Sequence, residues 1–140
     1  MFTGFDPSNT NATARSGSLR PDRIADGNLP VGQRSINGWF DANAFVAPPR
    51  NSGRFGNSGA FILSGPGMAV WSGGLSKRFA LGEHRRFRLM GVFQNLTNHP
   101  NFNLPANNIS TPGSVGRITS TLGTEGSGQR TVELSARFEF

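Results

Sequence analysis

The residue types that most often carry out chemistry are few and widely spaced in this 140-residue chain, which has no cysteine and two histidines, His84 and His99. The lack of cysteine excludes a disulfide framework, a thiolate metal site and a thiol nucleophile. A zinc-type site needs several ligands that converge on one ion, and neither histidine has a partner at ligand spacing. We therefore expect no metal site, with His84 a solvated turn residue and His99 making a structural hydrogen bond in a loop.

The eight carboxylates are spread along the chain and form no pair suited to general acid–base catalysis, which needs a group held within hydrogen-bond reach of the proton that it moves. Glycine-rich stretches at 53–59 (GRFGNSG) and 64–74 (SGPGMAVWSGG) precede no predicted helix, so they do not indicate a phosphate-binding loop. We predict that the chain is not an enzyme and that it binds no cofactor.

The chain is basic, with 14 Lys and Arg against 8 Asp and Glu and a formal net charge of +6. Nucleic-acid-binding domains gather their basic residues on one face or along one helix. Here the basic residues are almost all arginines, and they are scattered through segments rich in Gly, Asn and Pro. We predict no nucleic-acid partner; such arginines suit anionic lipid headgroups or a polar lumen.

The stretch 129–140 alternates between two kinds of residue in the period of a β-strand. The residues between its apolar positions are polar, and the apolar positions are Val132, Leu134, Ala136, Phe138 and Phe140. A helix would scatter these side chains around its circumference, whereas a strand places them on one face. The same period recurs at 69–81 and 85–95, although adjacent glycines weaken the first of these strands. We predict three antiparallel strands.

The segments between the strands differ sharply in length. A short polar turn separates 69–81 from 85–95, whereas the loop at 96–128 and the region 1–67 are long and rich in Gly, Asn and Pro. Such long loops are uncommon in compact soluble domains. Short turns on one side and long loops on the other are typical of a transmembrane β-barrel. We predict an all-β fold of antiparallel barrel strands, an incomplete barrel with long extracellular loops, in which residues 1–60 pack poorly.

The aromatic residues agree with a membrane-spanning sheet. If the short turn is periplasmic, one membrane boundary is marked by Phe79, Phe87, Phe138 and Phe140. Trp71 and Phe93 then lie near the other boundary. The eight residues from Trp71 to Phe79 span ~26 Å along a strand, which after tilting is of the order of the ~25 Å apolar band of such barrels. Lys77, the one cation on this face, is expected to extend its ammonium group toward the headgroups.

These strands predict two chemically distinct faces. The residues expected to face lipid, beside those of the last strand, are Trp71, Leu75, Phe79, Phe87, Leu89 and Phe93. The residues expected to face the lumen are Arg78, Arg86, Arg88, Glu133, Arg137 and Glu139. The arginines of this second set are expected to pair with carboxylates of neighbouring strands or of a domain inside the barrel.

Several stretches resemble the C-terminal end of a TonB-dependent receptor barrel, and most closely the Oar-like group with an N-terminal carboxypeptidase-regulatory-like domain. The resemblance covers residues 15–140, and its most specific parts are WFDANAF at 39–45 and NLTNHPNF at 95–102. It implies a longer parent protein with a signal peptide, a plug and a barrel of about 22 strands. The chain is then expected to be a C-terminal fragment, with an extracellular loop region at 1–67 and the last three barrel strands at 68–140, and without plug or signal peptide.

The resemblance also implies partners and a location. The full-length parent would lie in the outer membrane of a Gram-negative cell, import a ligand, contact outer-membrane lipid and couple to the TonB complex through its plug. The alternating last strand with Phe140 at its end resembles the signal that the β-barrel assembly machinery binds. Two alternatives are an oligomeric barrel in which several chains each supply strands, and a soluble β-rich binding protein. The loops at 53–59 and 95–105 either contact ligand at the outer mouth or pack on one another.

Overall fold

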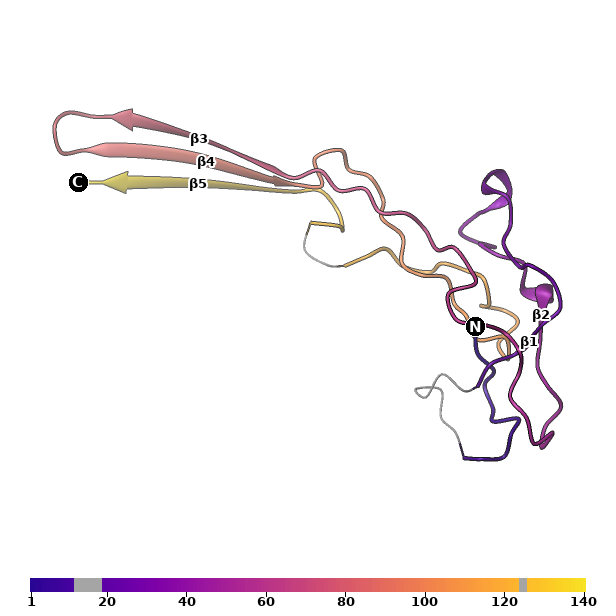
Figure 1. Cartoon of the computed structure of the whole chain (residues 1–140). Coiled ribbons are helices and arrows are strands. Elements are labelled where there is room, and N and C mark those ends of the chain that lie inside the picture. Colours follow the sequence, from indigo (N-terminus) through magenta and orange to yellow (C-terminus); the bar gives the residue numbers. More distant parts are fainter. Residues whose placement is uncertain (12–18, 124–125) are drawn as a thin grey trace. The chain divides into compact units, whose positions relative to one another are not determined.

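The computed structural model describes residues 1–11, 19–123 and 126–140 (Figure 1). The chain divides into two compact units, a loop unit of Met1–Gly65 with Leu104–Thr119 and a sheet unit of Pro66–Asn103 with Ser120–Phe140. Regular structure in the described ranges consists of β-strands and two short 3-10 turns, η2 (Val31–Gln33) and η3 (Ala42–Ala44). The prediction of an all-β, antiparallel fold is confirmed. No helix among the described residues is long and apolar enough to cross a bilayer.

The sheet unit contains β3 (Gly73–Ala80), β4 (Arg86–Gln94) and β5 (Thr131–Glu139), which form an antiparallel sheet in the order β3-β4-β5. Each strand lies inside one of the segments with two-residue periodicity and is shorter than that segment. A tight turn joins β3 to β4, in which the Leu81 amide donates to the Arg85 carbonyl at 2.9 Å. Gly82 has a φ of +99° there, a conformation that costs glycine far less than residues with a Cβ.

The register of the sheet sorts its side chains into an apolar and a polar face. Phe79 is opposite Phe87, which is opposite Phe138, so one aromatic row crosses all three strands. Directly opposite residues share a face in an antiparallel pair. Arg78, Arg88 and Arg137 form the neighbouring row, which therefore lies on the other face. The two sets of side chains expected from the sequence are thus separated by the pleat.

The loop unit has a small hydrophobic core of its own, so the expectation that residues 1–60 pack poorly is wrong for the described part of that range; residues 12–18 lie outside the described residues. Phe40, Ala44 and Phe45 are buried together, and the rings of Phe40 and Phe45 meet edge to face at 6.4 Å. Two short strands, β1 (Asp22–Arg23) and β2 (Phe45–Val46), pair antiparallel beside this core. Ile109 and Val115, from the second segment of the unit, pack against it.

Two buried asparagines organise the loop that follows β4, within the NLTNHPNF stretch. The Asn95 amide nitrogen donates to the carbonyls of His99 at 2.9 Å and Gly128 at 2.7 Å, while its oxygen accepts from the His99 amide. The Asn101 side chain donates to the Ser127 carbonyl at 3.0 Å and accepts from the Ala69 amide at 2.8 Å. We call Asn95 and Asn101, exposed by 1% and 0%, the asparagine clamp. The clamp ties the two ends of the long loop to each other and to the segment before β3.

The clamp gives a stability prediction for Asn101→Ala. Because the substitution removes the hydrogen bonds that the fully buried Asn101 side chain makes to the Ser127 carbonyl and from the Ala69 amide, we expect it to lower the free energy of unfolding by about 1–3 kcal/mol. Gln129→Ala is the matched control, because Gln129 is an exposed amide of the same unit, where such changes usually cost less than about 0.5 kcal/mol. Denaturant unfolding of the whole chain in detergent micelles measures both variants. Equal unfolding midpoints for the two would contradict a structural role for the clamp.

Candidate functional site

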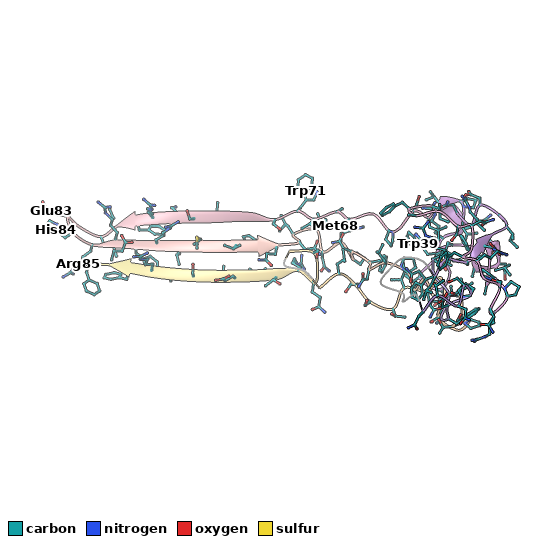
Figure 2. All side chains as sticks on the ribbon, turned by 60° about the horizontal axis from the view of Figure 1, so that its bottom comes forward. Trp39, Met68, Trp71, Glu83, His84 and Arg85 are labelled. Carbon is teal, nitrogen blue, oxygen red and sulfur yellow. The ribbon has the colours of Figure 1, made fainter. Side chains whose placement is uncertain are left out.

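The sheet offers two broad candidate surfaces, since side chains project from both of its faces (Figure 2). The turn with Glu83, His84 and Arg85 marks one end of the strands, and Trp71 lies at the other end (Figure 2). Trp71 precedes the first residue of β3, and its carbonyl accepts from the Leu96 amide at 2.7 Å. The aromatic residues therefore occur at both ends of the strands, as in the girdles of membrane barrels.

The apolar face is broad and unusually exposed. Leu75 and Leu134 are exposed by 75% and 79%, and Phe140, one residue past β5, by 95%. A groove of about 440 Å³ lies on this face and is lined by Gly91 and by apolar residues of all three strands, among them Leu75 and Leu134. Soluble monomers rarely expose contiguous apolar surface of this kind. An exposed apolar face is suited to contact with hydrocarbon, and the assignment of these residues to the lipid-facing set stays a prediction.

Lys77 is the one cation among the apolar-face residues of β3. Its ammonium nitrogen lies 5.2 Å from the centre of the Phe79 ring, within the range of a cation–π contact. The side chain therefore reaches along the strand toward the aromatic row instead of standing over the middle of the face. That orientation agrees with an ammonium group that extends toward headgroups at the membrane boundary.

The polar face collects all six residues predicted to face the lumen. Arg86 is opposite Glu139, Arg78 and Arg137 flank Arg88, and Glu133 is opposite Val92. Arg137 and Glu139 form an ion pair on this face, with the Arg137 Nε 3.2 Å from a Glu139 carboxylate oxygen. The face is thus polar and positively charged near the turn, and mixed farther from it, where Met90 and Val92 belong to it.

The sequence did not reveal a cleft in the loop unit. Its volume is about 390 Å³, and its walls include Arg20, Phe40, Ile62 and Leu104. These four residues come from four separate stretches of the chain, and no local pattern predicts that they meet. The cleft is mainly apolar with one guanidinium at its wall, which is the composition of a small-molecule binding site.

The GRFGNSG stretch packs on residues 20–22 and is held there by an ion pair. Both terminal guanidinium nitrogens of Arg54 donate to the Asp22 carboxylate, at 2.9 and 2.7 Å. The Gly56 amide donates to the Arg20 carbonyl at 3.0 Å, and a Cβ on Gly56 would come within 2.2 Å of that oxygen. Of the two interpretations of this loop, the structure favours packing over direct contact with ligand.

Asp22 carries the clearest electrostatic perturbation in the loop unit. The hydrogen bonds from Arg54 are the largest effect and lower the pKa of the Asp22 carboxyl. Burial opposes them, and a bond from the Asn57 amide adds a smaller lowering of the pKa. The same pair raises the pKa of Arg54. This is a structural ion pair at the base of a loop, and it brings together no second titratable group of the kind that catalysis requires.

The histidines lie apart from these surfaces. His84 is exposed in the turn, and it is the backbone of His99, through its amide and carbonyl, that makes the hydrogen bonds described for that residue. Across the described ranges, no group of three or more His, Cys, Asp or Glu side chains is placed to hold a metal ion.

An antiparallel sheet with one lipid-like and one polar face, joined by a tight turn at one end and long loops at the other, is the wall of a transmembrane β-barrel. The sequence model of the outer membrane beta barrel domain family matches residues 2–133, and the chain belongs to this family. Family membership indicates an outer-membrane location. Comparisons with curated proteins and with solved structures found no match.

The ion pair of the loop unit gives a prediction for Arg54→Gln. Because Arg54 is the main cause of the low pKa of Asp22, the substitution should raise that pKa toward its ordinary value of 3.8. The folded pKa is the lower one, so the pair stabilises the unit fully above the unfolded pKa, and this contribution is lost as the pH falls through the folded value. An NMR titration of the Asp22 carboxyl carbon measures the change.

Arg50→Gln is the control for this titration, because the Arg50 guanidinium lies over the Phe5 ring and not against Asp22. It should leave the midpoint of Asp22 in place. An unchanged midpoint in Arg54→Gln would show that the hydrogen bonds from Arg54 do not set the pKa.

Proposed function

We propose that the chain supplies the last three strands of a TonB-dependent receptor, whose complete barrel imports a ligand across the outer membrane. The observation that carries the proposal is the three-stranded wall, with its two chemically distinct faces and its long loops on one side. The resemblance of the NLTNHPNF and WFDANAF stretches supports the receptor class in particular. Import is the work of the whole receptor, because it requires a plug and a closed barrel.

Barrel closure explains why further strands are required. In the described sheet β4 is paired on both sides, whereas β3 and β5 are each paired on one side. Single-chain barrels of bacterial outer membranes have at least about eight strands. The missing strands come either from the rest of one long receptor chain, as we propose, or from further copies of this chain in an oligomeric barrel.

The receptor proposal predicts energy-dependent import. The gene that encodes this chain should encode, in the same reading frame and upstream, a plug and further alternating strands. Cells that express the complete protein should take up its ligand, and uptake should stop when the energy-coupling complex is removed. A heat-modifiable oligomer formed by the 140-residue chain alone would instead support the oligomeric barrel, and uptake that persists without the energy-coupling complex would exclude the receptor class.

We also propose that β5, with Phe138 and Phe140, is the segment that the β-barrel assembly machinery binds. The two rings lie 5.9 Å apart at the end of the apolar face. Together with Val132, Leu134 and Ala136 they complete the apolar alternation of the strand. One edge of β5 is paired with β4, and its second edge is available for β-strand addition.

This proposal predicts that Phe140→Ser in the complete protein reduces barrel insertion several-fold, because the assembly machinery loses an apolar anchor. Outer-membrane fractionation with heat-modifiable gel mobility measures insertion. Leu104→Ser is the control, since Leu104 is an equally apolar, exposed residue of a loop. Insertion that is reduced equally in both variants, or in neither, would contradict a specific role for Phe140.

A further inference from the structure

Three arginines stand side by side across the polar face, one from each strand. Arg78 is opposite Arg88, and Arg88 is opposite Arg137. Directly opposite residues have Cβ atoms ~5 Å apart, and like charges in this arrangement are destabilising. We call these three residues the arginine row. A row of like charges across a sheet requires a compensating partner.

The described part of the sheet supplies one carboxylate to the row. Glu139 pairs with the Nε of Arg137 at 3.2 Å. Arg88, at the centre, has an arginine on either side. One of its terminal guanidinium nitrogens donates to the Met90 sulfur at 3.8 Å. The Nε of Arg88 is buried and has no hydrogen-bond partner among the described residues. A buried guanidinium N–H without an acceptor is costly, which identifies Arg88 as the point where a partner is missing.

A fourth cation lies beside the row. Arg86 occupies the next position of this face toward the turn, opposite Glu139. Because Glu139 is the carboxylate that both Arg86 and Arg137 can approach, it cannot neutralise all four guanidinium groups. The positive charge is therefore concentrated at the turn end of the polar face.

We propose that the arginine row binds the carboxylates of an acidic peptide segment inside the barrel. Guanidinium groups bind carboxylates through two parallel hydrogen bonds, a geometry that each arginine of the row can supply. The row spans two strand spacings, or about 9–10 Å. That width accommodates two carboxylates of one extended segment, and it exceeds what a single inorganic phosphate reaches. This inference rests on the proposed function in one respect, that a complete receptor supplies such a segment to its lumen.

The probe is a fluorescent peptide of alternating Glu and Gly, with a peptide of alternating Gln and Gly as its neutral counterpart. The whole chain is held in zwitterionic detergent micelles, which cover the apolar face and leave the polar face in water. We expect the acidic peptide to bind with an affinity that falls as salt is raised, because the contacts are ionic. Arg88→Gln should weaken binding about tenfold or more, as expected for the loss of one charge-assisted pair.

Arg85→Gln is the matched control, because Arg85 lies in the exposed turn outside the row, and it should bind the acidic peptide like the unaltered chain. The denaturant midpoint of Arg88→Gln separates binding from folding: removing the central like charge should leave the midpoint unchanged or raise it. Arg88→Lys should recover only part of the affinity, because an ammonium group keeps the charge and loses the fork.

Several results would overturn the proposal. These are equal binding of the neutral peptide, an equal loss of binding in Arg85→Gln, and displacement of the acidic peptide by inorganic phosphate at a similar concentration, which would indicate a site for a free anion. Absence of binding to the unaltered chain would do the same. None of these results bears on energy-dependent uptake by the complete protein, so the failure of this inference is distinguishable from failure of the receptor proposal.

Discussion

The need to satisfy every backbone hydrogen bond in a bilayer is the constraint on which the rest of this structure depends. Hydrocarbon offers no water to an unpaired N–H or C=O group, and each such group costs several kcal/mol. β4 meets the requirement within the chain, because it is paired along both sides, whereas β3 and β5 each keep one edge for a further strand. The sheet is therefore one sector of a ring, and its stability in a membrane belongs to the closed barrel.

The low apolar content of the chain, 35%, follows from the same constraint. A barrel wall needs apolar side chains on its outer face only, and membrane lipid completes their burial. The loop unit is stabilised differently, by the core around Phe40, Ala44 and Phe45 and by the ion pair of Asp22 with Arg54. One chain thus combines two ways of stabilising its structure.

Sequence periodicity predicted what depends on local pattern and missed what depends on distant contacts. The alternation in 129–140 indicated both the strand and its two faces, since the pleat fixes them residue by residue. The loop core was not predictable, because Val115 packs against the cluster that contains Phe45 only after the chain has folded back over a long sequence separation. The NLTNHPNF stretch was recognised as distinctive, yet its physical role as an asparagine clamp emerged only with its partners Ala69, Ser127 and Gly128.

The arginine row shows how these two levels are connected. Alternation assigns each arginine to a face, whereas strand register decides whether arginines of different strands meet; a slip of two residues between β4 and β5 would place Arg88 opposite Glu139. The clamp opposes that slip, because Asn95 directly follows β4 and is bonded to Gly128, three residues before β5. The loop therefore stabilises a strand register in which arginines are adjacent, although the alternative register would place Arg88 opposite the Glu139 carboxylate. Adjacent like charges in a sheet are a local feature that opposes the overall fold. Features of this kind are concentrated at the sites where a protein binds something else.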